Sequence, residues 1–361
     1  MSLALTLGRR GLGRTWPNPA VGAVVVRVDG GTPVIVGRGT TQPGGRPHAE
    51  TEAIRQAGER ATGATLYVTL EPCSHYGKTP PCADAIIAAG ISRVVSAIED
   101  PNPEVAGRGH VRLRDAGVAV TVGVGAEEAR RAHAGHIMRV TSGRPHVFLK
   151  LAVSADGKVG LAGRKPVAIT GHAAWDRVHM MRAQHDAVLT GIGTVVSDNP
   201  LLTCRLPGMA TRSPVRLVLD SDLRLPIASK LVLSAKTTPL WVMCSSQAQR
   251  DSESALADHG AEIFRVSGSE GKLDLMEVFQ LLASRGITRL MVESGPKIAA
   301  AMIDAGLADE IALFRTEKTI GSDGLDALEG MPLTAITGSP RFMLRDNDTV
   351  GDDRLEVYER T

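Results

Sequence analysis

The pattern of hydrophobic and polar positions divides the chain into alternating strands and helices. Apolar runs bounded by glycine, proline or polar turns predict strands, and apolar residues spaced by three and four predict helices. In the first half the pattern predicts a short amphipathic helix within residues 1–15, strands at 20–26, 64–70, 92–98 and 118–124, and helices at 49–61, 82–90, 111–117 and 127–138. Gly90 is expected to end the helix at 82–90. This alternation is typical of a sheet covered by helices.

A second alternation begins after a cluster of turn-forming residues, "TSGRP" at Thr141–Pro145. Strands are predicted at 146–154, 186–193, 215–222, 240–246, 289–295 and 310–316, with helices between most of them. No internal repeat or low-complexity tract is present in the sequence. We therefore place a boundary near residue 143, with one α/β domain at 1–143 and a second at 144–361, because both lengths suit single domains.

Length and composition support this division. A chain of 361 residues is too long for one ordinary core, and 43% hydrophobic residues with a mean hydropathy of zero are ordinary for a soluble globular protein. No apolar run reaches the roughly 18 residues of a membrane span. The N-terminus lacks the charged and apolar regions of a signal peptide. We expect a cytoplasmic protein without a membrane partner.

Charge and aromatic content argue against nucleic acid as a partner. The formal net charge of +2 gives little attraction to polyanions, and an aromatic content of 3% leaves little surface for stacking on bases. We expect a small-molecule substrate, and we expect the protein to form a homo-oligomer, a dimer or a tetramer.

Two cysteines frame the proline-containing loop "LEPCSHYGKTPPC", Leu70–Cys82. Three interpretations compete for Cys73 and Cys82: a disulfide, a structural metal site, or part of a catalytic metal site. A reducing compartment argues against the disulfide. His48 adds an imidazole to the two thiolates, and such a set of three ligands leaves the fourth zinc position for water. The predicted helix N-terminus at Cys82 favours the thiolate form.

Glu50 favours the catalytic interpretation over the structural one. It stands two residues after His48, where zinc deaminases carry a glutamate that moves protons and is not a ligand. A structural site would need a fourth protein ligand, which the spacing does not supply. We therefore predict one catalytic zinc ion per chain, bound by His48, Cys73 and Cys82, with structural zinc as the alternative.

Two other cysteines and one other histidine, which could also bind metal, have simpler interpretations. Cys204 and Cys244 have no partner at ligand spacing and are expected to be small buried apolar residues. His75, inside the loop, either lines a substrate pocket or lies in solvent.

The second half shows no G-x-G-x-x-G after a strand, so it carries no Rossmann fingerprint. Its segment "MVESGPKIAAAM" predicts a strand, a glycine turn, a proline in the first helical turn and a helix. The free N–H groups of such a helix N-terminus can hold a pyrophosphate. Many turns between a strand and a helix look alike, so this pattern alone does not identify a site.

Five motifs follow one another in the first half: "PNPAVG", "HAE", "YVTLEPC", "PCSHYGKTPPC" and "DPNPEVAGRG". In this order they resemble the deaminase half of the bifunctional riboflavin-biosynthesis deaminase-reductase family. The resemblance implies a cytidine-deaminase-like α/β/α zinc domain that hydrolyses the 2-amino group of 2,5-diamino-6-ribosylamino-4(3H)-pyrimidinone 5′-phosphate. Glu50 would take a proton from the attacking water and deliver it to the departing ammonia. Asn18 is similar to the family's ring-binding asparagine.

The second half resembles the reductase half of the same family, so the resemblance covers nearly the whole chain. It rests on "LKLAVSADGKVG", "MRAQHDAVLTGIGTVVSDNPLLTCR", "VLDSDLRLP" and "VESGPKIAAAMI". It implies a dihydrofolate-reductase-like α/β domain that uses NADPH to reduce the ribosyl side chain to ribityl. Positions that match substrate contacts are Arg182, Leu202, Arg205 and Glu293, with Lys150 and Asp156 framing the reacting ribose. Positions that match cofactor contacts are Ala152, Thr194, Asp198, Ser221, Gly295, Pro296, Lys297 and Ile298.

The chain departs from the family pattern at three positions. Thr41 stands where the family often has a histidine, and Pro166 and Ala168 stand where it usually has serine and tryptophan. A contact in the deaminase site, a substrate hydrogen bond and a cofactor stacking surface are therefore absent or supplied by other residues.

Two other functions compete with this interpretation. One is a nucleic-acid deaminase with an appended binding domain, which the long cysteine spacing, sparse aromatics and near-neutral charge disfavour. The other is a nucleotide-binding scaffold that keeps zinc only for stability, which release of ammonia by the zinc-loaded protein would exclude.

Overall fold

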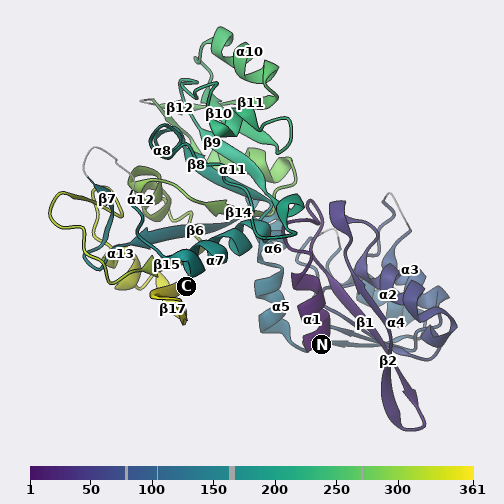
Figure 1. Cartoon of the computed structure of the whole chain (residues 1–361). Helices are drawn as coiled ribbons and strands as arrows, with labels where there is room; N and C mark the ends of the chain where they lie inside the picture. Colours follow the sequence, from purple (N-terminus) through teal and green to yellow (C-terminus); the bar gives the residue numbers. More distant parts are fainter. Residues whose placement is uncertain (78–79, 104, 162–166, 270) are drawn as a thin grey trace. The chain divides into compact units, whose positions relative to one another are not determined.

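The chain forms two compact units (Figure 1). The computed structural model describes residues 1–77, 80–103, 105–161, 167–269 and 271–361. One unit contains Met1–Pro145 and Leu282–Thr288, and the other contains His146–Leu281 and Arg289–Thr361. Each unit combines helices with a sheet of parallel and antiparallel strands, which confirms the predicted α/β fold class. The domain bounds 1–143 and 144–361, and the independent folding of the two domains, remain predictions. No helix within the described residues is long and apolar enough to cross a membrane.

The first unit is built on a sheet with the strand order β2-β1-β3-β4-β5. Strand β1 pairs antiparallel with β2 and β3, whereas β3, β4 and β5 run parallel. The strands are β1 Gly22–Asp29, β2 Thr32–Thr40, β3 Thr65–Val68, β4 Arg93–Ser96 and β5 Ala119–Val122. The helices are α1 Ser2–Arg9, α2 Ala49–Ala57, α3 Cys82–Ala88, α4 Arg108–Asp115, α5 Ala126–Ala132 and α6 Ala134–Ser142, with short 3₁₀ turns at Pro43–Gly45 and Gly58–Ala61.

Most predicted elements of this half are confirmed with shifts of a few residues, and two differ. Strand β2 was not predicted, because Pro33 and two glycines interrupt its apolar run. The helix predicted at 127–138 is two helices, α5 and α6, that meet at His133. The break lets the buried His133 imidazole reach the Thr69 hydroxyl, with Nε2 and Oγ1 3.0 Å apart.

Helix α2 packs on strand β2 at van der Waals distance because glycines leave room for it. A Cβ added to Gly39 would lie 1.9 Å from the Ala49 carbonyl oxygen, and one added to Gly37 would lie 2.1 Å from that of Ala53. Ala49 and Ala53 are fully buried on the facing side of the helix. This contact fixes the first turn of α2, where His48 and Glu50 stand.

The second unit is built on a sheet with the strand order β11-β10-β9-β8-β14-β6-β15-β18-β17. The strands from β11 to β15 in this order run parallel, whereas β18 pairs antiparallel with both β15 and β17. These strands are β6 His146–Val153, β8 Ala187–Gly191, β9 Val215–Leu219, β10 Leu240–Ser245, β11 Ala261–Val266, β14 Arg289–Val292, β15 Glu310–Arg315, β17 Phe342–Val350 and β18 Asp353–Arg360. Short strands β7 Lys158–Leu161 and β16 Gly324–Asp326 pair with each other, as do β12 Gly268–Ser269 and β13 Lys272–Leu273.

Helices connect most of these strands, as predicted. They are α7 His172–Ala183, α8 Ile192–Asp198, α9 Lys230–Leu233, α10 Arg250–Asp258, α11 Leu275–Ser284, α12 Pro296–Asp304 and α13 Thr334–Thr337, with a 3₁₀ turn at Ala210–Arg212. All six predicted strands are present. The C-terminal strands β17 and β18 were not predicted, because β17 is an edge strand of mostly exposed polar residues without an apolar run.

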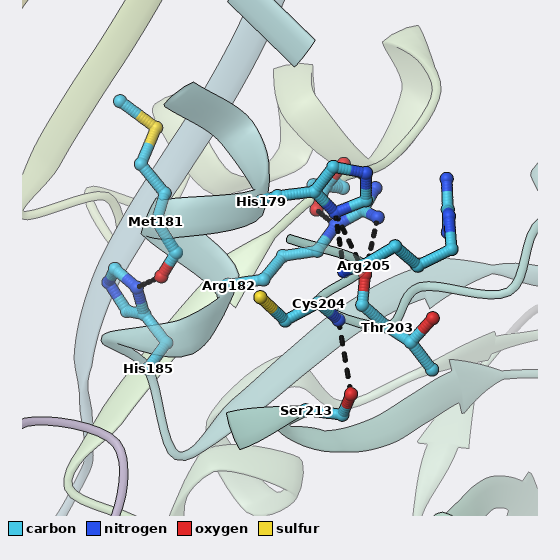
Figure 2. A network of polar contacts seen from close by, with 9 residues as sticks. His179, Met181, Arg182, His185, Thr203, Cys204, Arg205 and Ser213 are labelled. Atoms are coloured by element: carbon cyan, nitrogen blue, oxygen red, sulfur yellow. Dashed lines mark hydrogen bonds and ion pairs between the residues drawn. The ribbon is translucent and has the colours of Figure 1, made fainter. Parts of the chain in front are cut away.

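His185 is a buried histidine that follows α7. Its Nδ1–H donates to the Met181 carbonyl oxygen at 2.7 Å (Figure 2), and its ring lies 5.0 Å from that of Phe148. The other ring nitrogen is buried without a hydrogen-bond partner. Burial lowers the pKa of His185 to about 3, and the nearby Arg289 adds to this shift. The imidazole is therefore neutral in the folded protein at ordinary pH.

Acid should destabilise the fold through His185. The pKa of this side chain is about 3 when folded and 6.5 when exposed, so between these values the unfolded chain binds the extra proton. Its stabilising effect is complete above the unfolded pKa and is lost as the pH falls toward the folded pKa. Between roughly pH 7 and pH 5 the free energy of unfolding should fall by about 2 kcal/mol through this group. Urea unfolding followed by tryptophan fluorescence at both pH values measures the change.

A matched pair of variants assigns the effect. His185→Gln should remove this part of the pH dependence. His259→Gln should not, because His259 makes the same bond to the carbonyl four residues earlier at an exposed helix end. An unchanged pH dependence in His185→Gln would contradict the prediction.

Candidate active sites

Three side chains of the first unit meet with the geometry of a metal site. His48 is the N-cap of α2, Cys73 lies in the loop after β3, and Cys82 is the first residue of α3. The His48 Nδ1 atom lies 3.3 Å from the Cys82 sulfur and 3.6 Å from the Cys73 sulfur. One ligand atom from each residue therefore falls within 4.8 Å of the others. All cysteines are free, so the disulfide interpretation is wrong.

The two thiols differ in acidity. The Cys82 backbone N–H donates to the Cys73 sulfur at 3.3 Å. A hydrogen bond from the Cys82 thiol, more than any other factor, lowers the pKa of Cys73 to about 4. The same hydrogen bond, together with burial, raises the pKa of Cys82. One thiolate is thus already favoured, and a set of two sulfurs and one imidazole nitrogen suits zinc.

Glu50 is buried beside this cluster without a structural partner for its carboxylate oxygen Oε2. Burial, and next the Cys73 sulfur, raise the pKa of Glu50 to about 7. A buried carboxylate oxygen that no protein group satisfies is costly for a purely structural residue. The residues therefore fit a zinc ion and a water molecule, with Glu50 next to the metal and not part of its ligand set.

Asn18 and Thr41 lie on the loops around the cluster. The Asn18 side-chain amide donates to the Gly45 carbonyl oxygen at 2.8 Å, and its nitrogen lies 3.5 Å from His48 Nε2. Asn18 is thus next to the His48 ring, as expected for a residue of the substrate pocket. Thr41 is buried, and its hydroxyl accepts the Val21 N–H at 3.0 Å. At the position where the family often has a histidine, this chain therefore has a threonine that makes a structural hydrogen bond.

Glu71 is a residue of this region that the sequence interpretation missed. Its buried carboxylate accepts the backbone N–H groups of Asp100, Gly107, Gly109 and His110 at 2.8–3.2 Å. Glu71, Glu99 and His110 also have potential ligand atoms within 4.8 Å of one another. We interpret Glu71 as a clamp on the loop, because its oxygens already accept these N–H groups. Two features of the sequence could have indicated this role. Glu71 stands directly before Pro72 and Cys73, and the motif "DPNPEVAGRG" contains glycines whose N–H groups it can bind.

The second unit contains a cavity of about 980 Å³ on the side where the parallel strands β6, β8 and β14 end. Ligands of open α/β sheets bind at this edge. Eleven of the predicted reductase residues line the cavity: Lys150, Ala152, Arg182, Thr194, Asp198, Leu202, Arg205, Glu293, Gly295, Pro296 and Lys297.

A buried ion pair organises the cavity wall. The Arg182 guanidinium donates to both oxygens of Glu293, at 2.5 and 2.8 Å, and also to the Thr203 carbonyl oxygen at 3.1 Å. The imidazole of His179 donates to the same carbonyl at 3.0 Å (Figure 2). Three nitrogens of the Arg182 guanidinium already donate to protein oxygens. Part of the role of Arg182 is therefore to hold the loop that leads to Arg205.

Arg205 and Lys150 present positive charge to the cavity in different settings. The loop that carries Arg205 is fixed by the Thr203 contacts and by a hydrogen bond from the Cys204 N–H to Ser213 Oγ at 3.1 Å (Figure 2). Arg205 itself is exposed. Lys150 is half-buried, and desolvation lowers the pKa of its ammonium while the Glu293 carboxylate opposes this shift.

The turn before α12 suits a dinucleotide. Ser294 lines the cavity, and its buried hydroxyl oxygen has no hydrogen-bond partner. The next residue, Gly295, is the N-cap of α12, and Pro296 stands in its first turn. The first N–H groups of a helix carry partial positive charge and can bind phosphate oxygens. The cavity, the unpaired hydroxyl and this helix start together fit the pyrophosphate of NADPH.

Three predicted reductase residues lie outside the cavity lining. The Asp156 carboxylate accepts the Ser154 hydroxyl and the Ile320 and Gly321 N–H groups, and these bonds lower its pKa. The Ser221 hydroxyl donates to the Gly271 carbonyl oxygen at 2.9 Å. Ile298 faces Gly191. Each side chain makes a structural contact to a residue far away in the sequence, which the sequence motif could not reveal.

Trp175 and Lys230 line the cavity but were not predicted. Trp175 is 46% exposed on α7, and it is the one aromatic side chain among the described lining residues. An exposed tryptophan in a chain poor in aromatics was a usable signal. Ala168 is exposed and does not line the cavity, and Pro166 lies outside the described residues. Cys204 and Cys244 are buried as predicted, and His75 is exposed.

Comparison with known proteins identifies both units. The zinc-binding region of cytidine and deoxycytidylate deaminases matches residues 1–98, and the RibD C-terminal domain matches residues 145–353. The riboflavin biosynthesis protein RibD of Escherichia coli strain K12 is 40% identical, over 98% of this chain and 96% of its own. That of Aquifex aeolicus strain VF5 is 38% identical, over 100% of this chain and 97% of its own.

Solved structures agree over the full length. Acinetobacter baumannii RibD is 35% identical with a TM-score of 0.88, and the match covers 100% of this chain and 97% of that one. A diaminohydroxyphosphoribosylaminopyrimidine deaminase/5-amino-6-(5-phosphoribosylamino)uracil reductase from Thermotoga maritima is 36% identical with a TM-score of 0.85. This match also covers 100% of this chain and 97% of that one.

The metal cluster predicts a definite zinc content. The purified protein should contain one zinc ion per chain by elemental analysis, because two sulfurs and one imidazole form a good ligand set. His48→Ala and Cys73→Ser should each lose most of the zinc. His75→Ala, in the same loop region but exposed, should keep it. A zinc-free wild-type protein, or full zinc in Cys73→Ser, would contradict this assignment.

Proposed function

The chain belongs to the RibD family of bifunctional deaminase-reductases of riboflavin biosynthesis, and we propose which of its residues carry the two activities. It is a zinc-dependent deaminase and an NADPH-dependent reductase. The first unit hydrolyses the 2-amino group of 2,5-diamino-6-ribosylamino-4(3H)-pyrimidinone 5′-phosphate. The second reduces the ribosyl side chain of the deaminated product to ribityl, giving 5-amino-6-(5-phosphoribitylamino)uracil.

The observation that carries the deaminase assignment is the cluster of His48, Cys73 and Cys82 beside the buried Glu50. We assign the first three as zinc ligands. Zinc bound there supplies Lewis-acid activation of water near neutral pH. In this assignment Cys73 and Cys82 provide the negative charge of the site, and His48 is held in place by its position at the start of α2.

Glu50 is the residue to which we assign both proton transfers. Its free Oε2 accepts a proton as water adds its oxygen to the ring carbon, and delivers a proton to the amine, which leaves as ammonia. A carboxylate oxygen with no hydrogen-bond partner in the protein can serve both steps without breaking a hydrogen bond within the protein. Asn18, next to His48, is assigned to orient the pyrimidine ring.

In the reductase cavity we assign Lys150, Glu293 and Arg182 to the reacting end of the substrate. NADPH bound there supplies the hydride. The Lys150 ammonium and the Glu293 carboxylate lie in a buried part of the wall and can bind ribose hydroxyls. Arg205, exposed and in the cavity lining, is assigned to the 5′-phosphate, because a guanidinium binds two phosphate oxygens at once.

The compartment and assembly belong to the same proposal. Four free cysteines, one of them with a low pKa, favour a reducing cytoplasm. Strand β17 is an edge strand with Met343 56% exposed and Leu344 46% exposed. Such an edge favours pairing with a second copy, and we propose a homo-oligomer, a dimer or a tetramer.

Glu50→Gln tests the deaminase assignment. Glutamine keeps size and polarity but cannot take a proton from water or give one to the amine. Release of ammonia should fall at least about 10²–10⁴-fold, the typical contribution of general acid–base catalysis. Zinc content should stay at one per chain. Oxidation of NADPH with the already deaminated substrate should be nearly unchanged.

A glutamate on the same helix provides the control. Glu52 forms an ion pair with Arg55 at 2.9 Å, so Glu52→Gln should keep normal ammonia release. Normal deamination by Glu50→Gln would refute the proton-transfer role. Loss of zinc from that variant would make Glu50 a ligand and the site a structural one.

Arg205→Ala tests the reductase assignment. Loss of a charge-assisted contact to phosphate costs on the order of 1.5–3 kcal/mol, or roughly 10- to 100-fold in affinity. Steady-state kinetics should show a KM for the deaminated substrate raised by this factor, with the KM for NADPH little changed. Arg224→Ala removes an exposed arginine that does not line the cavity and should change neither value. If the KM for the substrate is unchanged in Arg205→Ala, Arg205 does not bind the phosphate and is only a surface charge.

A further inference from the structure

The charges of the reductase cavity leave two exposed cations without an acidic partner. Of the lining cations, Arg182 is paired with Glu293, and Lys297 lies 3.5 Å from Glu329. The lining acid Asp326 is paired with Lys158 at 2.8 Å. Lys150 is half-buried, and its ammonium interacts with the Glu293 carboxylate. Within the described lining this leaves Arg205 and Lys230 as exposed cations with no ion pair to a carboxylate.

The two ligands of this cavity carry three phosphate-containing groups. They are the 5′-phosphate of the substrate and the pyrophosphate and 2′-phosphate of NADPH. The start of α12, with the unpaired Ser294 hydroxyl, suits the pyrophosphate, and Arg205 is assigned to the 5′-phosphate. The 2′-phosphate remains without a cation, and Lys230 remains without an anion.

The order of strands places the segment that carries Lys230 away from Lys150 along the edge of the sheet. Four neighbouring parallel strands run in the order β6, β14, β8, β9, and their carboxyl ends share one edge. Strand β6 carries Lys150, β14 leads to α12, and β8 leads to α8 with Asp198. Lys230 follows β9. Neighbouring strands are about 4.8 Å apart, so the outer pair is separated by about 14 Å.

An extended dinucleotide matches this order. Its nicotinamide must approach the reacting ribose near Lys150, and its pyrophosphate suits the start of α12. With the pyrophosphate at the start of α12, Asp198 of α8 would be next to the adenosine ribose, and Lys230 would be the cation available to its 2′-phosphate. Among the described lining cations, only Arg205 and Lys230 belong to the chain segments between β8 and β10.

The backbone fixes Lys230 in this position. Its N–H donates to the Asn199 side-chain oxygen at 2.8 Å, which joins the start of α9 to the end of α8. Asn199 has a φ of 42°, in the left-handed region that asparagine tolerates. The Asp198 carboxylate, also in the lining, accepts the Ser197 hydroxyl at 2.6 Å. A carboxylate beside the ribose repels a 2′-phosphate, so a nearby ammonium is needed to bind it.

We propose that Lys230 binds the 2′-phosphate of NADPH and sets the preference of the reductase for NADPH over NADH. The inference rests on the proposed use of the cavity for NADPH and goes beyond it, because it assigns the cofactor preference to one side chain.

Binding measurements without turnover test the proposal. In isothermal titration calorimetry, Lys230→Met should weaken binding of 2′,5′-ADP about tenfold or more, the effect of losing a charge-assisted contact. Binding of 5′-AMP, which lacks the 2′-phosphate, should stay within about twofold. In kinetics with the deaminated substrate, kcat/KM for NADPH should fall by the same factor and that for NADH should not. Lys230→Arg should retain the preference.

Controls separate this inference from the proposed function. Lys236→Met, which removes an exposed lysine that does not line the cavity, should leave both ligands unaffected. The proposal is wrong if Lys230→Met weakens binding of 2′,5′-ADP and 5′-AMP equally, because Lys230 would then only offset the charge of Asp198. It is also wrong if the variant weakens neither, because Lys230 would then lie in solvent. A wild-type protein that does not oxidise NADPH with the deaminated substrate would instead refute the proposed reductase function.

Discussion

The deaminase site depends on how closely one helix can approach one strand. Gly37 and Gly39 of β2 leave no Cβ between the strand and the backbone of α2, and Ala49 and Ala53 complete the contact. Any larger side chain would push the first turn of α2 outward. That turn carries His48 and Glu50, so the spacing between the proposed zinc ligand and the proposed proton-transfer group follows from backbone packing.

The other two proposed zinc ligands come from separate elements that converge on this turn. Cys73 leaves the end of β3 and Cys82 begins α3, and the Cys82 N–H bound to the Cys73 sulfur joins the two segments. The Glu71 carboxylate fixes the neighbouring loop through four backbone N–H groups. A rigid arrangement of this kind lets Glu50 keep a free oxygen in a buried setting, which is costly elsewhere in a protein and useful beside a reacting water.

The reductase cavity obtains its order from the parallel sheet. Because parallel strands end at one edge, side chains separated by more than a hundred residues, such as Lys150 and Glu293, line the same wall. The Arg182–Glu293 pair and the Thr203 contacts then fix the loop that carries Leu202 and Arg205. Leu202 has a φ of 54° and is buried, an uncommon conformation that the surrounding contacts must maintain.

The sequence by itself determined the alternation of strands and helices and the family. It also predicted His48, Cys73 and Cys82, which the structure brings together beside Glu50, because each of these residues stands in a short motif. It did not determine strand β2, whose proline and glycines hide an apolar run, or strand β17, which is mostly polar and exposed. Strand β18 was also missed, although most of its residues are buried. Only the tertiary structure separated the cavity residues from Asp156, Ser221 and Ile298, whose side chains contact residues far away in the sequence. Only it brought Trp175 and Lys230 into the cavity, because strand order, which decides which loops meet, arises from long-range pairing that no local pattern encodes.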